Sequence, residues 1–175
     1  MALNSYLQLK GQKQGDINGS VIQKGREGKI AVIAFNHEVQ SPRDPATGQA
    51  TGKRIHKPFV ITKEIDSSSP MLYAALVNNE NITSWELQCF AASIRGTEVN
   101  NYTVKLTNAN IVDISSTMLN NKQPENLKMP LMEEVGFVYE RIEWTWVDGG
   151  INATDDWTSP VSMQTKRKNN KGRTI

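Results

Sequence analysis

The chain has 175 residues, which is enough for one domain with a sizeable core and short for two. Hydrophobic residues make up 38% and charged residues 22%, and no apolar run approaches the ~20 residues that a helix needs to span a bilayer, so we expect no membrane insertion. The N-terminus lacks the basic and then apolar segments of a secretory signal, so any export must use a route that reads no such signal.

The charge is distributed unevenly along the chain, although the formal net charge is only +2. Residues 161–175 hold five basic residues and no acid, which leaves 15 of the 20 basic residues against all 18 acids in the remainder. A slightly acidic body with a basic tail is unlike the broad basic surface of a nucleic-acid-binding domain. We therefore expect no nucleic-acid partner.

Most of the chain is predicted to be β-strand. Two strand candidates at the front, "LNSYLQLKG" and "GDINGSVIQKG", are separated by the segment from Gly11 to Gly15. Further segments rich in β-forming residues are 30–39, 82–90, 102–106 and 109–115. Thr107 and Asn108 form a plausible tight turn between the last two.

One segment, "DSSSPMLYAALVNNE", predicts a helix. Ser69 is expected to cap it, Pro70 suits its first position, and Asn78 can close it. The face expected to dock carries Leu72, Ala75 and Leu76. Many strands, one short helix and regular turns favour a mainly β fold: a closed or nearly closed antiparallel β-barrel with one short flanking α-helix and a long extended loop.

The segment "EEVGFVYERIEWTWV", residues 133–147, reads as one strand that is apolar on both faces. One parity carries Val135, Phe137, Tyr139 and Val147, and the other carries Val138, Ile142, Trp144 and Trp146. A barrel strand that faces water should alternate apolar and polar residues. We therefore expect the second face to be covered, either by the helix or by another subunit.

Residues 41–59, "SPRDPATGQATGKRIHKPF", are named here the arm. The arm is rich in Pro, Gly and Thr, and its charged residues are Arg43, Lys53, Arg54 and Lys57 against Asp44 alone. Loops longer than about 12–15 residues are uncommon in compact domains and tend to be disordered or functional. The arm is therefore the first candidate for a functional segment.

The sequence offers little support for catalysis. The only histidines, His37 and His56, lie in no recognisable catalytic or metal-binding pattern. The single cysteine, Cys89, cannot form an internal disulfide, which suits folding in a reducing cytoplasm. Its place in "WELQCF" favours a buried structural thiol over a nucleophile. We expect no enzyme activity, no cofactor and no metal.

Several separated segments together resemble the Hcp (TssD) family of bacterial type VI secretion tube proteins. They are "KGREGKIAVIAFNHEV", the stretch from "SPRDPATG" through "DSSSPMLYAAL", "MEEVGFVYERIEWTWVDGG" and "DDW". The similarity runs from about residue 2 to residue 160, in the order and spacing of the family. Residues 1–160 are thus expected to form an Hcp-like β-barrel domain, and the basic C-terminal segment 161–175 is expected to be flexible.

The resemblance implies a structural projectile assembled in the bacterial cytoplasm. Its expected partners are copies of itself, in stacked homohexameric rings with an open channel, together with a VgrG spike, contractile sheath and baseplate proteins, and small effector proteins carried in the channel. The arm is then a loop that contacts neighbouring subunits and the next ring, through Arg43, Asp44, Lys53, Arg54, His56 and Lys57. The expected subunit interface includes Glu133, Glu134, Trp144, Trp146 and Asp148.

Two other classes of function remain open on the residues alone. A monomeric β-barrel ligand-binding module would use the arm as a lid, and would need an interior cavity lined by apolar residues. An enzyme would use Cys89 or a histidine.

Overall fold

A computed structural model describes residues 4–93 and 96–157 of the chain. Within them, strands form a seven-stranded sheet in the order β13-β12-β9-β8-β1-β2, with β3 also paired to β1, and a four-stranded sheet in the order β10-β11-β7-β4. The larger sheet contains β1 Asn4–Gly11, β2 Gly15–Ile17, β3 Ile30–Val32, β8 Ile82–Ala92, β9 Glu98–Thr107, β12 Arg141–Trp146 and β13 Ile151–Asp156. The smaller contains β4 Ala34–Asn36, β7 Phe59–Glu64, β10 Asn110–Thr117 and β11 Met132–Val138.

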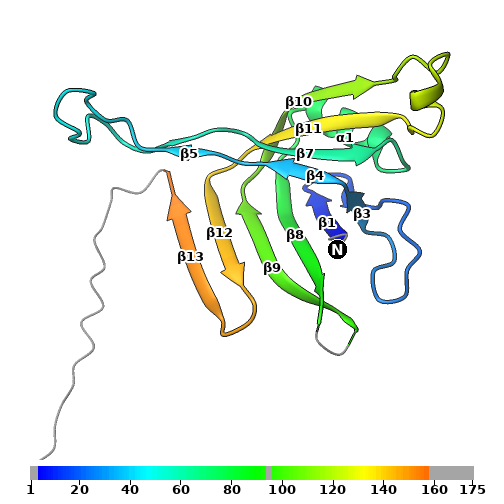
Figure 1. Cartoon of the computed structure of the whole chain (residues 1–175), viewed down its shortest axis with the longest axis horizontal. Coiled ribbons are helices and arrows are strands. Elements are labelled where there is room, and N and C mark those ends of the chain that lie inside the picture. Colours follow the sequence, from blue (N-terminus) through cyan, green and yellow to red (C-terminus); the bar gives the residue numbers. More distant parts are fainter. Residues whose placement is uncertain (1–3, 94–95, 158–175) are drawn as a thin grey trace, which may run out of the picture.

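Four short elements complete the description (Figure 1). Strands β5 Val39–Gln40 and β6 Ile55–His56 pair with each other, helix α1 spans Ser69–Val77, and a 3-10 turn spans Pro124–Asn126. The mainly β fold with one helix and antiparallel pairing is confirmed. The barrel is open, because no ladder among the described residues joins edge strand β10 to edge strand β13.

Aromatic rings fill the space between the two sheets. The ring of Trp85 on β8 meets Phe59 of β7 at 5.0 Å and Phe137 of β11 at 5.5 Å, both in edge-to-face geometry. All three side chains are essentially inaccessible to solvent. Such pairs add to the stabilisation from apolar burial, and they occupy the interior that a ligand-binding barrel would need to keep empty.

Residues 133–147 are two strands, so the prediction of one strand is wrong. The chain breaks at Tyr139 and Glu140, after which β12 joins the other sheet. Because β12 lies in the other sheet, its core-facing residues have the opposite parity, so that Val135 and Ile142, predicted on opposite faces, are both buried in the core. The second apolar face inferred from the sequence therefore largely disappears. Thr107 and Asn108 are likewise no hairpin turn, because β9 and β10 lie in different sheets.

Helix α1 also begins differently from the prediction. Ser68, not Ser69, precedes the first helical residue, and no side chain caps the helix. The Ser69 hydroxyl instead accepts a hydrogen bond from the backbone N–H of Asp66 at 3.0 Å and donates one to Glu133 at 2.7 Å. Leu72 and Ala75 are buried, and Leu76 packs against the core, as the apolar spacing predicts.

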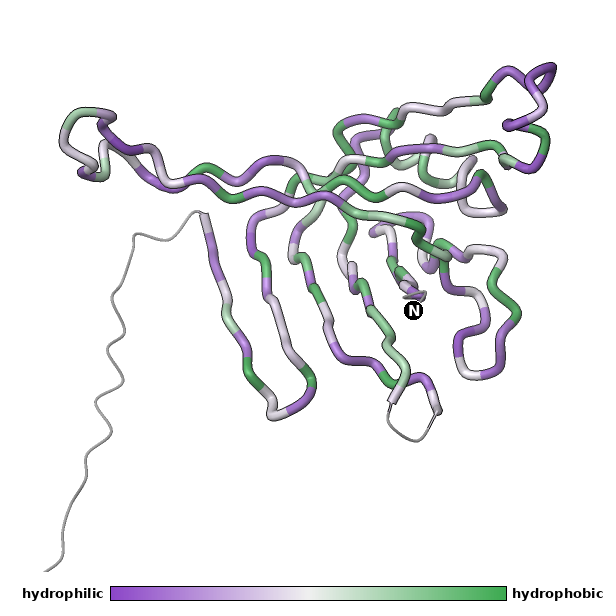
Figure 2. The backbone as a smooth tube through the Cα atoms, in the orientation of Figure 1, coloured by the Kyte–Doolittle hydropathy of each residue, from purple (hydrophilic) through white to green (hydrophobic). Residues whose placement is uncertain are grey.

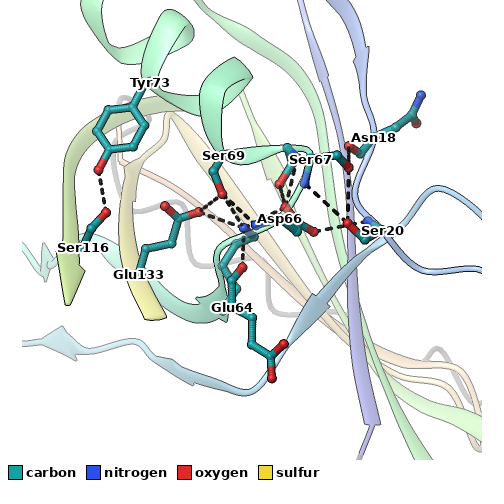
Figure 3. A network of polar contacts seen from close by, with 11 residues as sticks. Asn18, Ser20, Glu64, Asp66, Ser67, Ser69, Tyr73, Ser116 and Glu133 are labelled. Carbon is teal, nitrogen blue, oxygen red and sulfur yellow. Dashed lines mark hydrogen bonds and ion pairs between the residues drawn. The ribbon is translucent and has the colours of Figure 1, made fainter. Parts of the chain in front are cut away.

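A buried lysine, Lys63, joins the helix to the smaller sheet, and Figure 3 shows Asp66, Ser69 and Glu133, which accept hydrogen bonds from its ammonium. The ammonium of Lys63 on β7 donates to Glu133 Oε1 at 2.7 Å, to Asp66 Oδ1 at 2.9 Å and to the carbonyl of Glu64 at 2.8 Å. The side chains of Lys63 and Glu133 are both fully buried. A charge is tolerated at such depth only when it is paired and hydrogen-bonded, so these contacts fix the junction of β7, β11 and α1.

We expect Lys63→Met to destabilise the protein by about 3–5 kcal/mol, because it leaves the buried Glu133 carboxylate without its countercharge. The double variant Lys63→Met with Glu133→Leu should recover most of this loss, since an apolar pair of similar volume needs no compensation. The free energy of unfolding in urea measures both. The control is Lys105→Met, which removes the half-exposed partner of Glu86 at 3.2 Å and should cost at most about 1 kcal/mol. Equal losses for Lys63→Met and the double variant would contradict the assignment.

Candidate assembly surface

The arm projects away from both sheets as a two-stranded excursion (Figure 1). It begins after β5, returns through β6, and is also held by a bridge between Arg43 and Ala50 near its tip. Figure 2 shows mostly hydrophilic and neutral positions at its far end. An extended, polar projection of this kind offers main-chain groups and charges to a partner.

The tip of the arm is a folded turn. The Asp44 carboxylate accepts hydrogen bonds from the backbone N–H of Ala46 at 3.0 Å and the hydroxyl of Thr47 at 2.8 Å, and these contacts lower the pKa of Asp44. Gly48 adopts a left-handed conformation, with φ of 70°, which glycine takes without steric cost. Arg43 donates to the Gly48 carbonyl at 3.0 Å. The tip is therefore pre-shaped before any partner arrives.

The base of the arm is fixed by a chain of buried polar groups around Tyr139. Its hydroxyl lies 2.6 Å from Nε2 of His37 and 2.8 Å from Nδ1 of His56, and Nε2 of His56 lies 2.7 Å from an oxygen of Asp155 on β13. Arg54 forms an ion pair with Asp155 and donates to the carbonyl of Asp156 at 2.7 Å.

With both imidazoles neutral, one arrangement of protons satisfies every contact. His56 donates from Nε2 to the Asp155 carboxylate, so its Nδ1 accepts from the Tyr139 hydroxyl, which in turn accepts from Nε2 of His37. Burial and the neighbouring His56 lower the pKa of His37, which favours the neutral ring. Burial and then the charge of Asp155 raise the pKa of Tyr139, which keeps its proton in place.

Asp155 is ionised in this arrangement. Burial alone would raise its pKa, but hydrogen bonds from Arg54 and His56, together with the charge of Arg54, outweigh that effect and lower it. The indole of Trp157 covers the site, with its ring stacked over His56 at 5.8 Å and its N–H donating to the Tyr139 carbonyl at 2.5 Å. One end of the chain of contacts, Asp155, thus lies on the larger sheet, and the other end, His37, directly follows strand β4 of the smaller sheet.

The six predicted contact residues of the arm therefore divide into three groups. Arg54 and His56 hold the base, and Lys57 pairs with Glu38 at 2.7 Å. Arg43 and Asp44 shape the tip. Lys53 is exposed and makes no hydrogen bond or ion pair with the rest of the described chain. The sequence analysis treated the four cations of the arm as equivalent. In the structure, Lys53 is the one whose side chain has no partner in the part of the chain that is described.

The five residues predicted for the subunit interface are scattered. Glu133 is buried against Lys63, so it is not accessible to a neighbouring ring, and the structure corrects that prediction. Glu134 is exposed on β11, Trp144 is half-buried against the core, and Trp146 and Asp148 are exposed at the end of the β12–β13 hairpin.

The sequence analysis missed Tyr139, Asp155 and Trp157 as parts of the arm. They lie about 100 residues from His37 and His56 along the chain, and no local pattern links them. The only available signal was the presence of "DDW" and a tyrosine inside segments that match the Hcp family.

Residues 4–93 and 96–157 offer little support for a reactive thiol, a metal site or a membrane-spanning helix. Cys89 is buried, and burial raises its thiol pKa, which disfavours the reactive thiolate. No group of three or more His, Cys, Asp or Glu side chains there could hold a metal ion. Within the same residues, no helix has the length and apolar character to cross a membrane.

Comparisons with known proteins agree with the fold. Residues 6–146 match the family model described as "Type VI secretion system effector, Hcp". The "Major exported protein" of Pseudomonas aeruginosa is 43% identical over 171 residues, which cover 93% of this chain and 99% of that protein.

Solved structures of Hcp proteins are also similar to this chain in sequence and in fold. A mutant form of the Hcp1 protein from the E. coli EAEC 042 pathovar is 40% identical, with a TM-score of 0.77 and coverage of 87% of this chain and 97% of that one. The secreted protein Hcp3 from Pseudomonas aeruginosa is 36% identical, with a TM-score of 0.73 and coverage of 90% and 100%. From the family match, the sequence identity and the shared fold, the chain belongs to the Hcp family of type VI secretion proteins.

Proposed function

We propose that this protein forms hexameric rings that stack into the inner tube of a type VI secretion apparatus. In this proposal the tube is capped by a VgrG spike, enclosed by a contractile sheath on a baseplate, and expelled from the cytoplasm without a signal peptide. The number six comes from the resemblance to the family. The observation that carries the assembly role is the arm, whose tip is pre-shaped and whose base is locked to the body.

The geometry of the arm suits a contact between copies. A rigid projection loses less conformational entropy on docking than a loose loop does, so more of the contact energy appears as affinity. Its exposed Lys53 and the Arg43 guanidinium place positive charge near the tip, while the exposed Glu134 and Asp148 are acidic positions on the body. Opposite charges of this kind steer encounter and fix register.

The role as a carrier of small effector proteins rests on the second face of the seven-stranded sheet. Many of the side chains opposite to the core on β1, β8, β9 and β12 are polar and at least partly exposed, among them Gln8, Lys10, Ser84, Glu86, Lys105, Glu143 and Thr145. A ring whose channel is lined by this face would present hydrogen-bonding groups of both charge signs to a folded cargo. A monomeric ligand-binding barrel is disfavoured, because Trp85, Phe59 and Phe137 fill the interior.

The mass of the purified protein in solution tests the ring directly. Six chains of 19.5 kDa give about 117 kDa, and size exclusion with light scattering should find this mass at micromolar concentration. A single-chain mass at every accessible concentration, in the presence of the spike protein as well, would contradict the proposal.

A shortened arm tests the role of the tip while the contacts at the base remain in place. Replacing residues 43–53 by a short Gly-containing turn retains Arg54, His56 and Lys57, so we expect a folded protein with unchanged thermal stability. Stacking of rings, seen by electron microscopy, and export into the medium should fall at least tenfold. Normal export by this variant, at equal cellular abundance, would mean that the tip has no part in assembly.

Tyr139→Phe tests whether the base controls the arm. The variant removes the hydroxyl that joins His37 to His56 and leaves buried ring nitrogens unpaired, so we expect a loss of about 1–3 kcal/mol in unfolding free energy. Hydrogen exchange at the amides of β5 and β6 should quicken, while exchange in β8 and β9 stays slow. The matched control is Tyr73→Phe, which removes an exposed hydroxyl bonded to Ser116 at 2.6 Å. Equal exchange in both variants would show that the contacts do not hold the arm.

A further inference from the structure

The base of the arm brings together both histidines of the chain. His37 and His56 are the only two, and the centroids of their rings lie 6.3 Å apart. Nε2 of His37 and Nδ1 of His56 both bond to the Tyr139 hydroxyl oxygen, at 2.6 and 2.8 Å. An ordinary histidine changes its charge between about pH 5 and about pH 8. The number of protons held at the base therefore depends on pH over that range.

One carboxylate faces the two rings. It belongs to Asp155 of β13, which bonds to His56 at 2.7 Å and also forms the ion pair with Arg54. Glu38 and Lys57, next to the two histidines in sequence, pair with each other at 2.7 Å and are about half exposed. The remaining charged residues of the adjoining segments bond to neither ring, and they are Glu140, Arg141 and Asp156.

Aromatic rings occupy the other sides of the two imidazoles. Phe59 of β7 and Trp144 of β12 lie 5.1 and 6.0 Å from the His37 ring, and Trp157 stacks over His56 at 5.8 Å. An aromatic face attracts a cation, but it supplies no full negative charge. Two imidazolium rings at this place would therefore depend on the one carboxylate that Arg54 already shares.

One added proton leaves every contact at the base intact. Nδ1 of His37 bonds to no other described residue, so it takes the proton while Nε2 still donates to Tyr139. The Nε2 proton of His37 can then pass to the hydroxyl oxygen as the hydroxyl proton passes to Nδ1 of His56. This shift moves the positive charge to His56, beside the Asp155 carboxylate. Each contact keeps one donor and one acceptor in both forms.

A second added proton breaks this pattern. Both nitrogens that face Tyr139 then carry hydrogen and donate, so the hydroxyl hydrogen has no acceptor among the described residues. A buried donor without a partner is destabilising, and the two imidazolium charges repel each other across 6.3 Å. Burial and the neighbouring His56 lower the pKa of His37, which is the direction that this repulsion requires.

We call His37, His56, Tyr139 and Asp155 the brace. We propose that the brace is a pH-sensitive switch, which holds the arm while it carries at most one added proton and releases the arm when both imidazoles are charged. In the released form β5 and β6 separate from Tyr139 and Asp155, and the two charged rings are hydrated.

Acid favours the released form because that form binds more protons. Once the pH falls below about 6.5, the ordinary pKa of histidine, each further pH unit raises the ratio of released to held arms by up to about tenfold for one extra proton. Asp155 stays ionised in this range, because its pKa is lowered. Loss of that carboxylate is therefore not the cause of the release.

Hydrogen exchange at about pH 7.5 and about pH 5 tests the switch in the whole protein. The reporter is the backbone N–H of Lys57, which donates to the Glu38 carbonyl at 3.0 Å beside both histidines. Its protection factor, corrected for the pH dependence of intrinsic exchange, should fall at least about tenfold in acid. Amides in the middle of β8 and β9 should keep theirs. An unchanged protection factor at Lys57 would overturn the proposal.

His37→Gln is the matched variant. The glutamine amide nitrogen takes the place of Nε2 and can donate to Tyr139, but it does not take up a proton in this range. Its Lys57 amide should be protected at both pH values to within about twofold of the wild type at neutral pH. The same loss in acid for His37→Gln and the wild type would assign the effect to another group and refute the switch.

The wild type provides a second test that needs no variant. In protein labelled with nitrogen-15 at histidine, the imidazole signals should show that the pair takes up its two protons in separate steps, with one ring neutral while the other is charged. The release of the arm should follow the second step. Two rings that titrate together, as independent groups with ordinary pKa values, would refute the coupling through Tyr139.

The switch is a property of the single chain, and only its effect on stacking rests on the proposed function. In the proposed tube, stacks of the wild type seen by electron microscopy should come apart at about pH 5, whereas stacks of His37→Gln should persist. Release of the arm in protein that forms no stacks at either pH would support the switch and contradict the proposed tube. Wild-type stacks that persist in acid, with the arm held, would refute the switch and leave the tube standing.

Discussion

The buried contact between Lys63 and Glu133 is the constraint on which the rest of the architecture depends. Two charges are removed from water at the meeting point of β7, β11 and the start of α1, and each remains tolerable only while the other is in place. The same ammonium also holds Asp66, whose carboxylate accepts from the backbone of Ser20 at 3.2 Å and so ties the loop before β3 to the helix. The helix is too short to be stable alone. Its position is therefore set by electrostatics at its first turn as well as by apolar packing.

Sequence reasoning reached the class of the fold because that class depends on local patterns. Segments of β-forming residues, a Pro near the helix start and the apolar spacing of Leu72, Ala75 and Leu76 were enough for a mainly β protein with one docked helix. It failed at residues 133–147 because the chain passes from the smaller to the larger sheet at Tyr139 and Glu140, so that the core lies on the opposite side of the strand afterwards, and no Gly or Pro marks the change. It also failed at Ser69. In the sequence, a serine before Pro looks the same whether it caps a helix or donates a hydrogen bond to a buried carboxylate, as Ser69 does to Glu133.

The candidate site was less predictable than the fold. The arm was recognisable from its length and composition, but its charges appeared equal, and only tertiary contacts show that Arg54 and His56 hold the base while Lys53 remains exposed. The partners Tyr139 and Asp155 come from the far end of the chain, and nothing local marks them. Family resemblance supplied the identity of the system, whereas the contacts at the base of the arm are visible only in the structure.

The attachment of the arm has a mechanical consequence. A hairpin joined to a body only through its two strands bends at the junction when its end is pushed. Here Asp155, on the edge strand of the larger sheet, pairs with Arg54 and forms a hydrogen bond with His56. Tyr139, on the link between the sheets, forms hydrogen bonds with His37 and His56. A sideways load on the tip is therefore carried through side chains into both sheets at once. The arm is therefore braced at Tyr139 and does not bend freely at its junction with the body. In the proposed stack of subunits, a force along the stack would be resisted by the whole body of each subunit.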